Sequence, residues 1–282
     1  MFRRVAFFAY GTFSYLAFLA TFLYAIAFVE GIAVPTRLDG PAVGPIGVSL
    51  LIDTILLGIF AVQHSVMARR GFKAWWTRVV PQEMERSTFV LFASAALALL
   101  VWQWRPLGGT VWQVDIAAGR AALMAASALG WTTVLVATFL INHFDLFGLR
   151  QSWYALRGKR YQRVALATPW LYRFVRHPLY LGFVIAFWSA PTMTLAHLVF
   201  AIATTAYILI AIRLEERDLI AEHGAAYETY RRQVPMLLPA SRPAAVVMTV
   251  ERAATGRTAV KNTLVLVLPV LAVLGLELML RF

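Results

Sequence analysis

The chain has 282 residues, of which 60% are hydrophobic and only 14% are charged, and its mean hydropathy is +0.69. Because ordinary soluble domains are about 45–50% apolar and about 25% charged, this composition excludes a soluble globular fold. The absence of cysteine excludes disulfides, thiolate metal sites and a cysteine nucleophile, whereas the net charge of +12 fits either a nucleic acid or a membrane partner until its distribution is known.

Six apolar runs are candidates for membrane helices, because a span needs about 20 mostly apolar residues. The first four runs are residues 5–29, 46–68, 87–104 and 121–141. Residues 178–212 carry no formal charge but exceed the length of one upright helix, and Pro191 would interrupt its hydrogen bonds. We therefore predict a hairpin of two short helices there, hinged near residues 190–194. The last run, residues 263–279, is marginally long enough to span a membrane.

Positive charge is distributed unevenly between these runs. Of the 26 Lys and Arg residues, 22 lie in the segments 1–4, 69–86, 150–176 and 213–261. Since Lys and Arg accumulate in cytoplasmic loops of membrane proteins, we predict an all-α integral membrane protein with a cytoplasmic N-terminus and a bundle of about five to seven helices. No compact basic and aromatic patch stands out, so nucleic-acid binding is not expected.

Polar clusters at the predicted cytoplasmic ends of the spans form the candidate site. Ionisable groups near membrane depth are costly and often functional, and such groups occur at His64, in residues 142–145, in residues 176–178 and in residues 215–218. Because all four clusters reach the same side of the membrane, we predict a site that faces the cytoplasm.

Structural explanations for these clusters also stay open. His64 could reach the interface or bond a neighbouring helix, residues 142–145 could form a hydrogen-bonded helix terminus, and residues 215–218 could be a solvated helix end. His197 and Glu30 lie on the opposite side, where we expect structural or interfacial roles.

One paired motif resembles a known superfamily. The stretch YRFVRHPLYLG at residues 172–182 is followed by EERDL at 215–219, and then by Gly224, Tyr227 and Tyr230. Over about residues 168–239, this pattern resembles the isoprenylcysteine carboxyl methyltransferase superfamily. The resemblance implies an integral membrane enzyme that uses S-adenosylmethionine without a Rossmann domain, and the chain indeed contains no G-x-G-x-x-G run after a strand.

Other segments narrow the resemblance. Combined with RHPLYLG, the segments QHSVMAR at 63–69 and NHFDLFGL at 142–149 resemble the bacterial methanethiol S-methyltransferases over about residues 1–240. This implies methylation of methanethiol to dimethyl sulfide, with S-adenosylhomocysteine as the other product, in the bacterial cytoplasmic (inner) membrane. Trp170-Leu171 stands where the wider superfamily often has Gly-Pro, which argues against a prenylated carboxylate substrate.

The resemblance also implies a domain organisation. Residues 1–240 would form the membrane methyltransferase domain, with its core at 168–239. Residues 241–282 would form a C-terminal extension that holds the last apolar run. The oligomeric state stays open.

The resemblance assigns S-adenosylmethionine to two sets of residues. One set is Arg176, His177, Tyr180 and Gly182, and the other is Glu215, Glu216, Tyr227 and Tyr230. Carboxylates could accept hydrogen bonds from the ribose hydroxyls or the amino group, a guanidinium could pair with the donor carboxylate, and an aromatic face could stabilise a sulfonium. Glycine would permit close backbone approach.

The thiol substrate must lose its proton during the reaction, because alkyl thiols are mostly protonated at neutral pH and the thiolate is the nucleophile. We predict His64 or His143 as the catalytic base, with Asp145 as the group that orients an imidazole. The sulfonium charge could instead lower the thiol pKa enough to make a base unnecessary. No metal site is expected.

Alternatives from other functional classes stay open. A haem-binding NnrU-like isomerase or redox protein would use His64 and His143 as axial ligands. A transporter would use the polar residues of the spans as a permeation path. A methyltransferase could also act on another small acceptor, such as hydrogen sulfide.

Overall fold

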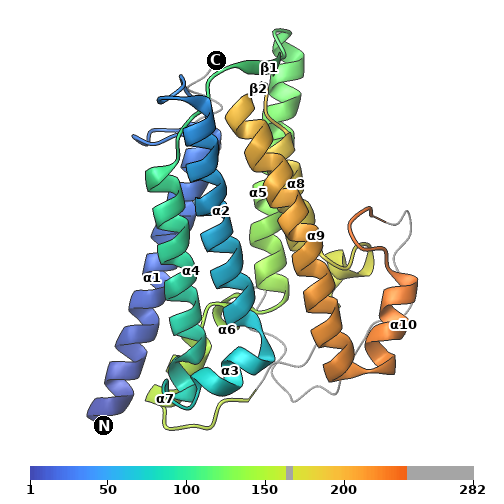
Figure 1. Ribbon diagram of the computed structural model, residues 1–282. Coiled ribbons are helices and arrows are strands. Elements are labelled where there is room, and N and C mark those ends of the chain that lie inside the picture. Colours follow the sequence, from blue (N-terminus) through green and yellow to red (C-terminus); the bar gives the residue numbers. More distant parts are fainter. Residues whose placement is uncertain (163–167, 240–282) are drawn as a thin grey trace. The chain divides into compact units, whose positions relative to one another are not determined.

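A computed structural model describes residues 1–162 and 168–239 (Figure 1). Their regular secondary structure is almost entirely helical, which confirms the predicted all-α class. Five of their helices are long and apolar enough to cross a membrane: α1 (Phe2–Glu30), α2 (Ile46–Ala68), α4 (Gln82–Gln103), α5 (Ala117–Leu140) and α9 (Leu195–His223). The predicted run at residues 263–279 lies outside the described part of the chain.

Shorter elements connect the long helices. They are α3 (Arg70–Trp76), β1 (Thr110–Gln113), α6 (His143–Leu146), α7 (Leu149–Leu156), a 3₁₀ turn at Trp170–Arg173, α8 (Pro178–Trp188), β2 (Thr192–Thr194) and α10 (Ala225–Gln233). β1 and β2 pair antiparallel, with Thr110 opposite Thr194 and Gln113 opposite Thr192. We did not predict these strands, because they are too short to show an alternating pattern.

The predicted hairpin is half right. α8 ends at Trp188, shortly before Pro191, so the expected interruption is confirmed. The prediction that the second helix is short was wrong, because α9 has 29 residues and runs to His223. Residues 215–218 contain no helix breaker, and the helix ends only at Gly224, whose φ of 54° and ψ of −134° suit glycine.

The described residues form two compact units. The first comprises residues 1–113, 144–162 and 192–207, and the second comprises the rest of the described chain. In the first unit, α4 packs against α1 and α2, and α7 packs against α1. Phe18 of α1 stacks on Phe147 with ring centroids 3.8 Å apart. Aromatic packing therefore joins the first helix to the segment after residue 143.

In the second unit, α5 and α8 approach each other closely through glycine. A β-carbon at Gly182 would lie 2.7 Å from the carbonyl oxygen of Gly130, and one at Gly130 would lie 2.7 Å from that of Gly182. Small residues allow the backbones of membrane helices to come this near. Edge contacts of Trp131 with Phe183 and Phe187 flank the crossing. This packing holds α8 in place, and the candidate site lies at its N-terminal end.

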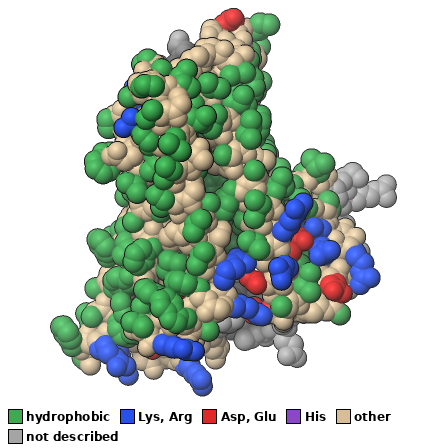
Figure 2. Space-filling view, in the orientation of Figure 1, with side chains coloured by type: hydrophobic (Ala, Val, Ile, Leu, Met, Phe, Trp, Pro, Cys, Tyr) green, Lys and Arg blue, Asp and Glu red, His purple; other side chains and the backbone are tan. Residues whose placement is uncertain are grey.

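Hydrophobic side chains cover the long helices, and Lys and Arg side chains gather near the end of the first unit at which α1 begins (Figure 2). Many large apolar residues of the long helices are exposed, including Leu51 and Leu129 at 60% and Val62 at 63%. Such exposure is unfavourable in water but suits lipid. The protein is therefore an integral membrane protein.

Candidate functional site

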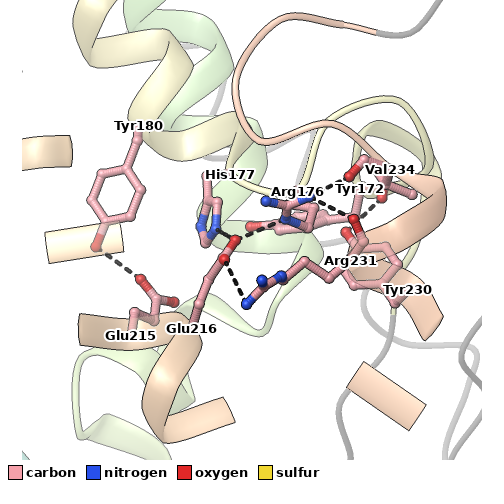
Figure 3. Close-up of polar contacts among 9 residues, drawn as sticks. All are labelled: Tyr172, Arg176, His177, Tyr180, Glu215, Glu216, Tyr230, Arg231 and Val234. Atoms are coloured by element: carbon pink, nitrogen blue, oxygen red, sulfur yellow. Dashed lines mark hydrogen bonds and ion pairs between the residues drawn. The ribbon is translucent and has the colours of Figure 1, made fainter. Parts of the chain in front are cut away.

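Glu216 of α9 is the centre of a polar network in the second unit (Figure 3). Its Oε1 accepts hydrogen bonds from Nε of Arg176 at 2.8 Å and from Nε2 of His177 at 3.0 Å. Its Oε2 lies 4.0 Å from Nη1 of Arg231. Glu216 is 8% exposed. An ionised carboxylate can only accept, so Nε2 of His177 carries the hydrogen in this pair.

Arg176 also caps the C-terminal end of α10. Its Nη1 donates to the carbonyl oxygens of Arg231 at 2.8 Å and Val234 at 2.5 Å. A cation is favourable at a helix C-terminus, where carbonyl groups lack helical partners. The backbone N–H groups of Arg176 and His177 donate to the carbonyls of residues 235 and 236. The guanidinium therefore joins the start of α8 to the end of α10.

Tyr227 and Tyr230 hold α10 in position. They are 2% and 3% exposed and pack with Val234. The hydroxyl of Tyr230 donates to the carbonyl oxygen of Tyr172 at 2.7 Å. Burial raises the pKa of both phenols well above the usual value of about 10, so they stay neutral. Packing and one hydrogen bond account for both residues, and their role as donor ligands stays a prediction.

Glu215 and Tyr180 form a separate pair beside this network. The hydroxyl of Tyr180 donates to Oε2 of Glu215 at 2.9 Å, and Glu215 is turned away from the Arg176 network (Figure 3). Glu215 is partly exposed. Among residues 1–162 and 168–239, no Lys, Arg or His forms an ion pair with it. The two adjacent glutamates thus differ, because Glu216 forms ion pairs with Arg176 and Arg231, whereas Glu215 has no ion pair in the described part of the chain.

His143 lies in the second unit with a defined hydrogen-bond partner. Its Nδ1 lies 2.8 Å from Oγ1 of Thr138, and this hydroxyl donates its own hydrogen to the carbonyl of Leu135 at 2.7 Å. We therefore assign the hydrogen to Nδ1 and the lone pair to Nε2. Burial lowers the pKa of His143 to about 4, so the ring is neutral at pH 7.

Asp145 belongs to the first unit and has other partners. It accepts a hydrogen bond from the hydroxyl of Tyr161 at 2.8 Å, and Nη1 of Arg150 lies 3.4 Å from the same oxygen. Nδ1 of His143 thus has the hydroxyl of Thr138 as its partner, whereas the carboxylate of Asp145 has the phenol of Tyr161 and the guanidinium of Arg150. A role for Asp145 in orienting His143 stays a prediction.

His64 lies in α2 of the first unit between two aromatic rings. Its ring centroid is 5.4 Å from that of Phe60 and 5.0 Å from that of Phe89. Its Nδ1 is buried and has no hydrogen-bond partner among the described residues. A buried polar atom of this kind costs free energy unless water or a ligand satisfies it, so His64 stays a candidate for contact with a small molecule.

The structure brings most of the predicted donor-binding residues together. Arg176, His177, Tyr180, Glu215, Glu216 and Tyr230 lie in one neighbourhood, and Tyr227 packs beside Tyr230. Gly182 lies further along α8, where close packing on Gly130 explains the glycine. Two residues of these networks, Arg231 and Thr138, were not predicted from the sequence. The only signal for Arg231 was its basic charge in the last turn of α10.

Comparisons with known proteins find several relatives that carry the same enzyme name. A methanethiol S-methyltransferase of Mycobacterium tuberculosis is 57% identical over 230 residues, which cover 82% of this chain and 94% of that protein. A methanethiol S-methyltransferase of Crocosphaera subtropica is 56% identical over 82% of this chain and 90% of its own length. Nurim of Mus musculus is 28% identical over 61% of this chain and 68% of its own. No family model and no solved structure matches.

Proposed function

The chain belongs to the family of methanethiol S-methyltransferases, and on this premise we propose that it methylates methanethiol to dimethyl sulfide, with S-adenosylmethionine as the methyl donor. The relatives support the reaction and the acceptor. They give no support to the haem-binding or transport alternatives. The donor is inferred from the RHPLYLG and EERDL motifs together with the geometry around Glu215.

The carboxylate of Glu215, which has no ion pair within residues 1–162 and 168–239, is the observation that carries the donor assignment. Glu215 has a neutral phenol as its partner at 2.9 Å and no ion pair among the described residues. A carboxylate beside an aromatic ring favours a cationic ligand. When bound, S-adenosylmethionine would supply a methyl group on a positively charged sulfur, and its ammonium and ribose hydroxyls are further donors for a carboxylate. The residues present therefore fit this donor.

The remaining residues of the network are proposed to position this pair. Glu216 holds Arg176 and His177 through one oxygen, and Arg176 holds the end of α10. Since Glu215 and Glu216 are neighbours on one helix, a fixed Glu216 also fixes the direction of Glu215. We propose that Glu215 and Tyr180 contact the donor, and that Arg176, Glu216 and Tyr230 act through them.

The reaction converts a thiol and a sulfonium into two neutral sulfides and one proton. The thiol sulfur forms a bond to the methyl carbon, the bond between that carbon and the sulfonium breaks, and the S–H proton must leave. Nε2 of His143 carries a lone pair and could receive this proton. With a pKa of about 4, His143 is too weak to deprotonate a free thiol at pH 7, so it would act only as the new bond forms. The unpartnered Nδ1 of His64 is the other candidate.

The cellular location is proposed from charge. The Lys and Arg residues concentrate on one set of predicted loops, and the positive-inside rule then favours a cytoplasmic N-terminus and a site that faces the cytoplasm. We propose the bacterial cytoplasmic membrane as the location. Residues 1–240 are proposed as the methyltransferase domain.

The test uses the full chain purified in detergent with methyl-labelled S-adenosylmethionine and methanethiol in a sealed vial. We expect labelled dimethyl sulfide in the headspace. Glu215→Gln should abolish most of it, whereas the matched control Glu228→Gln, an exposed carboxylate on α10, should not. Failure of the wild type to bind the donor would refute the donor assignment. Donor binding without dimethyl sulfide would refute methanethiol as the acceptor.

A further inference from the structure

A cavity of about 130 Å³ lies in the first unit, and none of its lining residues belongs to the network around Glu216. It is lined by Trp153, Tyr154, Arg157 and Lys159, at the end of α7. The guanidinium of Arg157 lies over the indole of Trp153 at 5.4 Å, and this indole packs edge-on against Phe8 of α1 at 5.6 Å. The cavity therefore combines an aromatic wall, packed on the first membrane helix, with two cations.

Positive charge is concentrated around this cavity. Five exposed cations belong to this part of the first unit: Arg3, Arg4, Arg157, Lys159 and Arg160. The cations of α1 lie beside those that follow α7, because a β-carbon at Gly158 would overlap the guanidinium of Arg4. Within residues 1–162 and 168–239, none of the five forms an ion pair with a carboxylate, and the nearby acidic residue Asp145 pairs with Arg150. The cavity is therefore suited to an anion.

The position of the cavity points to a lipid as the source of that anion. α1 begins at Phe2 and is long and apolar enough to cross a membrane, so its first turn lies at the depth of the lipid headgroups. Phe2 is 88% exposed and Val5 is 48% exposed, directly beside Arg3 and Arg4. A free phosphate would match only the cations, whereas a phospholipid matches the cations through its headgroup and the apolar surface of α1 through its acyl chains.

We propose that this cavity binds the headgroup of an anionic phospholipid, with its phosphate held by Arg157 and Lys159. The planar guanidinium can donate two parallel hydrogen bonds to phosphate oxygens, and the ammonium adds a point charge. Trp153 forms the wall at the level of the interface, where indoles are favoured. Bound lipid would hold α7 against the start of α1.

The proposal is tested on the full chain in detergent micelles. The probe is phosphatidylglycerol with brominated acyl chains, whose binding is read as quenching of tryptophan fluorescence, with brominated phosphatidylcholine as the neutral lipid. Each cation near an anionic lipid contributes about a fivefold factor in affinity, so Arg157→Gln with Lys159→Gln should weaken phosphatidylglycerol binding about 25-fold. The matched control, Arg70→Gln with Arg78→Gln, removes the same charge from the region of α3 and should change binding less than twofold. If the double variant Arg157→Gln with Lys159→Gln does not yield folded protein, Arg157→Lys should still weaken phosphatidylglycerol binding severalfold. This substitution keeps the positive charge but loses the two parallel hydrogen bonds of the guanidinium.

Three results would overturn the proposal. Equal quenching by the two brominated lipids would show that the headgroup charge is not recognised. An equal loss in the pocket pair and in the control pair would show a general surface effect in place of a site. Complete displacement of the lipid by millimolar inorganic phosphate would identify a free anion, and not a lipid, as the ligand.

Discussion

Removing the charge of Glu215 should weaken donor binding without changing stability, whereas removing the charge of the adjacent Glu216 should lower stability. In Glu215→Gln, the amide oxygen can still accept the hydrogen bond of Tyr180, so the free energy of unfolding should change by less than about 0.5 kcal/mol. If Glu215 contacts the donor through a charge-assisted hydrogen bond, its loss should cost about 1.5–3 kcal/mol of binding. This corresponds to donor affinity that is about 10- to 150-fold weaker.

Glu216→Gln should instead destabilise the protein. The side chains of Arg176 and Glu216 are 10% and 11% exposed, and removing one charge of such a buried pair costs about 3–5 kcal/mol. His177 would lose its acceptor in the same step. The thermal unfolding midpoint of this variant should therefore fall clearly, and donor binding should weaken as a consequence of the displaced network.

Two measurements on the same detergent-purified samples separate these effects. Isothermal titration calorimetry with S-adenosylmethionine, in the absence of methanethiol, measures the affinity of the donor site, and the tryptophan fluorescence melting curve measures stability. The expected pattern is weak binding at normal stability for Glu215→Gln and reduced stability for Glu216→Gln. Glu215→Gln with unchanged affinity, or with a loss of stability as large as that of Glu216→Gln, would refute the division of roles between the two residues.

Three further predictions concern packing and protonation. Gly182→Ala places a β-carbon 2.7 Å from the carbonyl oxygen of Gly130 and should destabilise the protein by about 1–3 kcal/mol. In the control Gly58→Ala, the β-carbon meets nothing within 4 Å, so the melting temperature should not fall. Equal melting temperatures of the two variants would contradict the packing argument. Burial lowers the pKa of His143 to about 4, against about 6.5 in the unfolded chain. Between these pH values the unfolded state binds more protons than the folded state. The free energy of unfolding should therefore rise by about 3 kcal/mol as the pH increases from about 4 to 6.5. Melting curves across this range should show a shallower dependence in His143→Gln, and an identical slope would show that this imidazole is not the group that titrates. Tyr230→Phe removes the hydrogen bond to the carbonyl of Tyr172 and should cost about 1 kcal/mol of stability; a large loss of donor affinity at unchanged stability would instead place the hydroxyl in the donor site.

Several features of this protein were determined by its sequence alone. Hydropathy over a window of about 20 residues is a local property, and it located α1, α2, α4 and α5. The length of the run at 178–212 and its Pro191 indicated the interruption after α8. The motifs at residues 63–69, 142–149, 176–182 and 215–219 indicated the family that the relatives confirm. Both depend on which residues are present and in what order, and not on which side chains meet.

The partners of each side chain were decided only by the tertiary structure. Sequence treated Glu215 and Glu216 alike, yet one faces Tyr180 and the other binds Arg176 and His177. Thr138 became the partner of His143 because α5 ends in a turn that returns the imidazole to it. The network around Glu216 joins residues about 40 positions apart in the chain, and the direction of each carboxylate depends on how α8, α9 and α10 pack. Hydropathy and motif spacing contain no information on that packing, since it arises from contacts between segments that are distant in sequence.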